Sequence, residues 1–306
     1  MAHAAAPGRD PDAAIRTDLL EKRYGRRVAL HGLSLTVPRG SVFGFLGPNG
    51  AGKTTAVKLL LGLVRPTAGE GMVLGGPIGD PSARRRIGYL PELFRYQDWL
   101  SAREVLRSHA VLAGLGRERI AAATDSALEL VGLEGEGRRR VGAFSKGMQQ
   151  RLGLAAALIG EPELVVLDEP TSALDPVGRH EVRGIIQGLR DRGATVFLNS
   201  HLLTEIEAVC DEVAVVDHGR VIASGRLDEL LQARGAEVAV DGLDSAAVAR
   251  LGGTMAAPGA AIFPDIAESD VPELVAAIVA NGGRVYRVTP RKASLEQIFL
   301  DWLEVR

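Results

Sequence analysis

The fold of this chain is set by eight consecutive residues, Gly47-Pro48-Asn49-Gly50-Ala51-Gly52-Lys53-Thr54. They match the pattern G-x-x-x-x-G-K-[ST], which requires a strand before it and a helix after it. An apolar run at 41–46 precedes the motif, and a helical pattern at 54–61 follows it. Glycines let the backbone curl, so that its N–H groups and the helix N-terminus surround phosphate oxygens. The stretch therefore predicts a nucleotide-phosphate site, and a glycine-rich turn with a chance lysine is a much weaker interpretation.

A second motif supplies the acidic groups that such a site needs. The apolar run at 164–167 is followed directly by Asp168 and Glu169. Two carboxylates after a buried strand are costly unless a cation or a substrate proton uses them. We expect Lys53 to reach the β- and γ-phosphates, and Thr54 and Asp168 to hold Mg²⁺. We assign Glu169 as the base that polarises the attacking water; the alternative is a salt-bridge pair at a strand end.

Composition narrows the class of protein further. The 306 residues allow about two domains. Hydrophobic residues make up 46% and charged residues 24%, the balance of a globular protein. A net charge of -2 gives no global positive field for nucleic acid or an anionic membrane. The single Cys210 excludes an intramolecular disulfide framework, and no run approaches the ~18 apolar residues of a membrane span. We expect a cytosolic chain that reaches a membrane only through a partner.

The pattern along the chain predicts a flexible tail at 1–14, an α/β domain at 15–225 and a smaller α+β domain at 226–306. Strands of the first domain are expected at 33–37, 41–46, 87–90, 164–167, 195–198 and 212–217. Two of these runs, at 164–167 and 195–198, are apolar without alternation, as in central parallel strands. Between about 92 and 160 the strand signal gives way to helical patterns at 101–113, 118–131 and 145–159, which predicts an inserted helical subdomain.

The C-terminal segment has its own mixed pattern. Strands are expected at 236–240, 261–265 and 284–288. A helix with an apolar face from Val271 to Ile278 is expected to end at Asn281-Gly282-Gly283. Ser294 with Gln297 forms a capping-box pattern for a last helix with an apolar stripe that includes Trp302. Core packing explains these stripes better than membrane binding does.

The segment Phe144-Ser145-Lys146-Gly147-Met148-Gln149-Gln150-Arg151 resembles the LSGGQ signature of ABC transporter ATPase subunits. It precedes the Asp168 strand by the short interval usual in that family. Lys146 and Met148 depart from the signature. The resemblance implies a P-loop NTPase fold of the ABC type. It also implies that this helix start caps the γ-phosphate held by the opposite subunit, through a helix dipole and a Ser hydroxyl.

Other positions carry over from the family in chain order. Tyr24 corresponds to the aromatic that stacks on adenine, and His201 to the switch histidine at the γ-phosphate. Asp175 ends a D-loop-like Ser172-Ala173-Leu174-Asp175 and is expected at the dimer interface with Ser145 and Gly147. Glu92 stands where the family usually places a metal-binding Gln. The resemblance thus gives Lys53, Glu169 and His201 catalytic roles. The expected ATP-binding residues are Tyr24, Gly47, Pro48, Asn49, Gly50, Ala51, Gly52, Lys53, Thr54, Thr55, Ser145 and Gly147.

By resemblance, two copies of this chain close on two ATP molecules with Mg²⁺ and drive a separately encoded membrane permease on the inner face of the cell membrane. The C-terminal extension, with Thr289-Pro290, is similar to the daunorubicin-type resistance exporters. The alternative is an ABC-type ATPase with a regulatory, ribosome-associated or DNA-associated role, although no basic stripe with aromatics predicts nucleic-acid binding. Phe94, Tyr96 and Trp99 form either a satellite core or a permease-binding patch.

Overall fold

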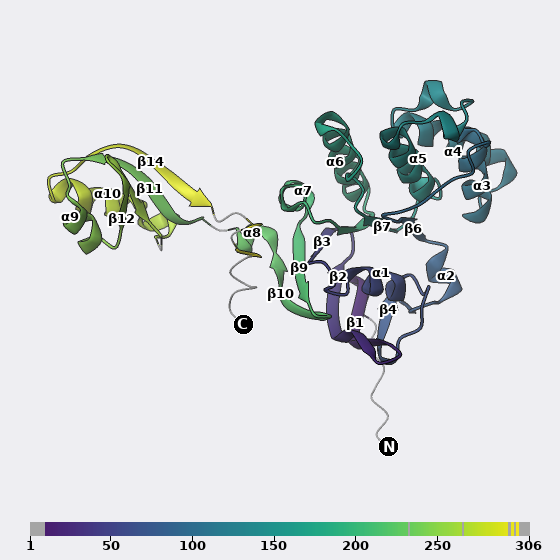
Figure 1. The fold of residues 1–306 in the computed structure, drawn as a ribbon, viewed down its shortest axis with the longest axis horizontal. Helices are drawn as coiled ribbons and strands as arrows, with labels where there is room; N and C mark the ends of the chain where they lie inside the picture. Colours follow the sequence, from purple (N-terminus) through teal and green to yellow (C-terminus); the bar gives the residue numbers. More distant parts are fainter. Residues whose placement is uncertain (1–9, 232, 265, 293–294, 297, 300–306) are drawn as a thin grey trace, which may run out of the picture. The chain divides into compact units, whose positions relative to one another are not determined.

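A computed structural model describes residues 10–231, 233–264, 266–292, 295–296 and 298–299. The chain divides into two compact units, the first ending at Arg226 and the second beginning at Leu227 (Figure 1). Within the described residues, no helix is both long and apolar enough to cross a bilayer. The expected tail at 1–9 and the expected last-helix positions Ser294, Gln297 and Trp302 lie outside the described residues.

A six-stranded sheet forms the centre of the first unit, in the order β10-β9-β3-β8-β7-β6. Its strands are β3 (Val42–Leu46), β6 (Ile87–Leu90), β7 (Leu164–Asp168), β8 (Thr195–Asn199), β9 (Glu212–Asp217) and β10 (Arg220–Arg226). All neighbours are parallel except β10, which runs antiparallel to β9. Every residue of β3, β7 and β8 is buried, which confirms the prediction of central parallel strands from apolar runs.

A second, antiparallel sheet in the order β2-β1-β4-β5 was not expected beyond residues 33–37. Its strands are β1 (Ala13–Tyr24), β2 (Arg27–Pro38), β4 (Ala68–Val73) and β5 (Gly76–Pro77). β1 begins at Ala13, so a tail reaching to residue 14 is wrong by two residues. The strand escapes pattern analysis because Leu19 has a φ of 45° and the register shifts on both sides of it. These bulges interrupt the alternation of polar and apolar residues by which strands are recognised.

The main core lies between the two sheets and includes helix α1 (Lys53–Leu60). Phe43 of β3 stacks on Phe197 of β8 with ring centroids 6.0 Å apart, and both side chains pack with Leu33 and Leu35 of the antiparallel sheet. Figure 1 shows α1 and this sheet on one side of the six-stranded sheet and α5, α6 and α7 on the other. In the described part of the first unit, the remaining helices outside the insert are α2 (Pro81–Arg84), α6 (Pro176–Asp191) and α7 (Leu203–Val209).

The helical insert is present between β6 and β7. It contains α3 (Ala102–Leu112), α4 (Arg117–Leu130), α5 (Lys146–Leu158) and the short 3-10 turns η1 (Glu134–Glu136) and η2 (Val141–Ala143). Ser101 and Glu104 form a capping box that begins α3. The three aromatic residues predicted to lie together in this region differ in burial. Phe94 and Tyr96 are half-buried with ring centroids 5.4 Å apart, whereas Trp99 is 70% exposed. The first two therefore pack in a satellite core, and only Trp99 presents its ring to solvent.

The C-terminal unit begins with α8 (Leu227–Leu230) and forms an antiparallel sheet in the order β12-β13-β11-β14. Its elements follow as β11 (Ala233–Asp241), α9 (Ser245–Arg250), β12 (Thr254–Ala257), β13 (Ala260–Phe263), η3 (Glu268–Asp270), α10 (Val271–Ala280) and β14 (Arg284–Lys292). This β-α-β-β-α-β order is the ferredoxin-like arrangement. The core joins Val238 and Phe263 of the sheet to Val248 of α9 and Ile278 of α10. A mixed α and β unit was expected here, although the strand at 254–257 and the helix at 245–250 were not.

Candidate functional site

The phosphate-binding loop connects β3 to α1, as the sequence predicted. Gly52 is the N-cap residue of α1 and has a φ of 103°, a backbone conformation that residues with a Cβ rarely adopt. A Cβ at Gly47 would lie 2.2 Å from the carbonyl oxygen of Val216, so only glycine fits there. The Gly219 N–H donates to the carbonyl of Ala51 at 2.7 Å and ties the loop to the β9–β10 turn. These backbone contacts thus hold the loop against β9 and the β9–β10 turn, with the N-terminus of α1 at its end.

Lys53 places its ammonium group inside this loop. Its Nζ donates to the carbonyl oxygens of Gly47 at 2.6 Å and Pro48 at 3.2 Å. Burial lowers the pKa of Lys53, and the carboxylates of Glu169, Asp168 and Glu92 partly oppose that shift. A half-desolvated cation beside a helix N-terminus is a strong site for a phosphate.

The carboxyl ends of β7 and β8 bring two buried polar side chains together. Asp168 pairs in register with Asn199, and Asn199 Nδ2 donates to Asp168 Oδ1 at 2.5 Å. Burial raises the pKa of Asp168; the hydrogen bond from Asn199 opposes the shift, and the charges of Glu92 and Glu169 add to it. A cation at this position would stabilise the ionised form. Sequence analysis missed Asn199, although its place directly after a predicted parallel strand was a usable signal.

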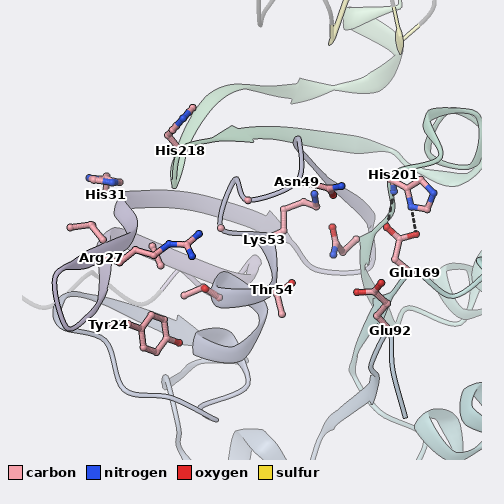
Figure 2. Close-up of a pocket in the computed structure, with 16 residues that line it drawn as sticks. Tyr24, Arg27, His31, Asn49, Lys53, Thr54, Glu92, Glu169, His201 and His218 are labelled. Atoms are coloured by element: carbon pink, nitrogen blue, oxygen red, sulfur yellow. Dashed lines mark hydrogen bonds and ion pairs between the residues drawn. The ribbon is translucent and has the colours of Figure 1, made fainter. Parts of the chain in front are cut away.

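Glu169 and His201 are in direct contact (Figure 2). The backbone N–H of His201 donates to Glu169 Oε1 at 2.9 Å, and His201 Nδ1 lies 2.7 Å from Glu169 Oε2. Glu169 is 7% exposed and its φ is 54°, in the left-handed region. A glutamate in that conformation is costly unless its surroundings hold it there, and such strain clusters at functional sites.

Lys53, Glu169, Asn199 and His201 line one cavity of about 840 Å³, shown in Figure 2. Ten of the expected site residues line it, namely Tyr24, Asn49, Gly50, Gly52, Lys53, Thr54, Thr55, Glu92, Glu169 and His201. Residues that the sequence did not single out also line it, namely Arg27, Val28, Ala29, His31, Asn199 and His218. Tyr24 is half exposed, and Lys22 Nζ lies 5.0 Å from the centroid of its ring. The cavity therefore extends from an aromatic surface, past the loop, to a carboxylate and an imidazole.

Three expected site residues lie elsewhere. Ser145 caps α5, its Oγ accepting from the N–H of Met148 at 3.2 Å, and Asp175 caps α6 by accepting from Gly178 at 2.8 Å. A Cβ on Gly147 would lie 3.5 Å from the Leu174 side chain, so the two helix starts are neighbours. Neither Ser145, Gly147 nor Asp175 lines the cavity. The remaining expected residues that do not line it are Gly47, Pro48, Ala51 and Asp168.

Known proteins resemble this chain along most of its length. The ABC transporter family model matches residues 30–172. An uncharacterized ABC transporter ATP-binding protein of Nostoc sp. is 39% identical over 90% of this chain and 84% of its own length. The daunorubicin resistance ATP-binding protein of Streptomyces coeruleorubidus is 47% identical over 72% of this chain and 70% of its own. A solved ATP-binding subunit of an ABC transporter is 30% identical, with a TM-score of 0.66, over 71% of this chain and 91% of its own.

Proposed function

Since this chain belongs to the ATP-binding, ATP-hydrolysing subunits of ABC transporters, we propose that two copies close around two ATP molecules and drive a separately encoded membrane exporter. One observation supports the proposal that the chain works as a dimer. The cavity is lined by residues of the loop, by Glu169 and by His201, whereas Ser145 and Gly147 lie at the start of α5 and do not line it. A site that lacks its second helix N-terminus is completed by the same helix of another copy, whose dipole favours the γ-phosphate.

The cavity supports hydrolysis by residues placed along it. Tyr24 offers its ring to the adenine, and Lys53 with the loop N–H groups binds the phosphates. Glu169 orients a water whose oxygen bonds to the γ-phosphorus, while the bond from that phosphorus to the bridging β–γ oxygen breaks. The proton leaves the water for the Glu169 carboxylate, and ADP and phosphate separate. His201, held by Glu169, is positioned to donate to the γ-phosphate.

Thr54, Asp168 and Glu92 fit Mg²⁺. Among the described residues, no three His, Cys, Asp or Glu side chains group as a metal site by themselves. Thr54 and Glu92 line the cavity, and the pKa of Asp168 is raised by burial and by neighbouring carboxylates, so a cation would relieve a real electrostatic cost. Bound Mg²⁺ would neutralise phosphate charge and polarise the transferring group. Glu92 would supply an oxygen ligand as Gln would, and its negative charge would strengthen the attraction to the cation.

We base the proposed export direction and membrane location on the similarity of this chain to named relatives. The Streptomyces protein is named for daunorubicin resistance, and a Nod factor export ATP-binding protein of Rhizobium meliloti is 41% identical over 72% of this chain. We infer a related role at the inner face of the cell membrane, with the permease as the second partner. The competing function is a regulatory ATPase whose partner transports nothing.

The experiment that tests the proposal is purification of the tagged full chain in mild detergent, with and without ATP, followed by identification of the co-eluting proteins. Glu169→Gln serves as the trap, because it keeps ATP bound. We expect a dimer and a multi-spanning membrane protein in stoichiometric amount, whose addition stimulates ATP hydrolysis by the native chain. Recovery of ribosomes or DNA, or of an ATP-bound monomer, would overturn the dimeric exporter while leaving the ATPase chemistry in place.

A further inference from the structure

Gln150 is one of the buried polar residues of the first unit that have no part in the mechanism above. Gln150 lies in α5, is 6% exposed, and its Nε2 donates to two successive carbonyl oxygens, those of Glu169 at 3.4 Å and Pro170 at 3.1 Å. A neutral amide in the interior must satisfy its hydrogen bonds within the protein, so these contacts fix where it lies. Gln150 therefore connects the helical insert to the backbone that carries the catalytic carboxylate.

That backbone needs support. Glu169 has a φ of 54°, which a residue with a Cβ adopts only when its neighbours hold it there. Its N–H donates to the carbonyl of Asn199 at 2.9 Å. Its carbonyl accepts from the N–H of Ser172 at 3.3 Å and from Ser172 Oγ at 3.1 Å, within the same turn. Gln150 is the donor that arrives from a different element, 19 residues earlier in the chain.

The helix that carries Gln150 also presents Ser145 at its N-terminus, between one and two turns away. The next residue, Arg151, forms an ion pair with Glu181 of α6 at 2.6 Å. The α5 helix is thus attached on one side to Glu169 and on the other to the helix that Asp175 caps. A small displacement of α5 must move the Glu169 backbone or break the bonds from Gln150.

We propose that Gln150 is a positioning residue for ATP hydrolysis. Its two hydrogen bonds hold the Glu169 backbone so that the carboxylate faces the cavity, and they transmit any displacement of α5, and hence of Ser145, to Glu169. The inference rests on the proposed role of Glu169 in activating water. It requires no contact between Gln150 and the nucleotide, so it predicts an effect on turnover and not on binding.

The test compares Gln150→Met with Gln187→Met in the full chain. The first change keeps the length of the side chain and removes its donor. The second makes the same change at an exposed residue of α6, whose Nε2 donates to the carbonyl oxygen of Ala208 at 3.5 Å. A misplacement of about 1 Å at a reacting group can cost up to ~10² in rate. We expect Gln150→Met to lower kcat by about tenfold or more, with the KM for ATP and the Kd for a non-hydrolysable ATP analogue changed by less than about threefold. Gln187→Met should retain kcat.

A merely structural role is distinguished by a double-mutant cycle with Glu169→Gln, measured as slow single-turnover hydrolysis of labelled ATP. If Gln150 acts through the Glu169 carboxylate, Gln150→Met should add little to the loss that Glu169→Gln already causes, because contacting groups that act together are not additive. Equal kcat for Gln150→Met and the native chain would overturn the inference. So would multiplicative losses in the cycle, or a fall in kcat that tracks a lower melting temperature. Absence of hydrolysis by the native chain would instead contradict the proposed function.

Discussion

The two units of the chain differ in what they bury. Among the described residues, every buried polar or charged side chain belongs to the first unit, including Asp168, Glu169, Asn199 and Gln150. The buried cluster of the C-terminal unit consists of apolar side chains alone, namely Ala236, Val238, Val240, Val248, Ala261, Phe263, Leu274 and Ile278. One unit thus keeps costly groups in its interior, and the other is stabilised by packing.

The cost in the first unit is concentrated at one place. Thr171 Oγ1 and Asn199 Oδ1 are buried with no hydrogen-bond partner among the described residues. Asn199 is the last residue of β8, and Thr171 lies three residues after the end of β7. The left-handed Glu169 lies beside them. Unsatisfied groups and backbone strain lower stability, and proteins retain them where a ligand uses them. We therefore expect changes at these groups of the first unit to affect turnover, and changes in the apolar core of the C-terminal unit to affect folding.

The largest effect on turnover, with folding unchanged, is expected from Glu169→Gln. Removing one group that stabilises charge in the transition state typically costs ~10²–10³ in rate. Phosphate release should fall by about that factor, while ATP affinity changes little because the amide keeps the shape of the side chain. The matched control is Glu237→Gln, an exposed glutamate of the C-terminal unit. If both variants hydrolyse ATP at the native rate, the chemistry does not depend on this carboxylate.

Shortening a core side chain of the C-terminal unit should lower the stability of that unit and leave ATP hydrolysis unchanged. Ile278 is fully buried, and an Ile→Ala change in a core costs about 2–5 kcal/mol. In urea, the transition of the C-terminal unit should move to lower concentration in Ile278→Ala. ATP hydrolysis by the unassisted chain should stay native, because the cavity lies in the first unit. A parallel loss of hydrolysis would show that the two units fold as one cooperative block.

Tyrosines allow a matched pair of smaller changes. Stacking of a base on an aromatic ring is worth about 1–3 kcal/mol, so Tyr24→Ala should weaken ATP binding by roughly 5- to 150-fold and leave turnover at saturating ATP unchanged. Tyr286→Ala removes an exposed tyrosine of the C-terminal unit and should leave the affinity for ATP unaltered. Titration calorimetry with ATP compares them. Equal affinities in the two variants would exclude Tyr24 as the adenine surface.

The smallest effect is expected at an exposed ion pair of the C-terminal unit. Arg284 donates to Asp241 at 2.5 Å, and this bond, with the N–H of Gly242, lowers the pKa of the Asp241 carboxyl. A lowered pKa stabilises the fold above the unfolded value of about 3.9, and that contribution is lost as the pH falls through the folded pKa. In Arg284→Ala the titration of Asp241, followed by its carboxyl carbon shift, should move to higher pH. An unmoved midpoint would mean that the ion pair is not formed in solution.

Much of the fold could be predicted because central strands carry a local signal. The runs predicted as strands at 87–90 and 212–217 are strands with those bounds. The apolar residues 213–216 of β9 are buried, as expected for a strand inside the sheet, whereas β6 lies at the sheet edge and alternates half-buried and buried residues. The antiparallel sheet was missed where bulges in β1 break the alternation. The loop residues of the site were easier to predict than the other residues that line the cavity. The loop residues are adjacent in sequence, whereas Arg27 and His31 belong to β2 and His218 belongs to the β9–β10 turn.

The sequence by itself determined the phosphate loop, the acidic pair at 168–169 and the helix start at Ser145, because each depends on backbone conformations of consecutive residues. Tertiary structure alone decided that Asn199 bonds to Asp168, that Gln150 supports Glu169, and that Ser145 lies outside the cavity of its own chain. The hydrogen bond from Gln150 to Glu169 joins residues 19 positions apart, and the bond from Asn199 to Asp168 joins residues 31 positions apart. They depend on strand register and on how a helix packs. These are properties of the whole fold, so a short stretch of sequence does not predict them.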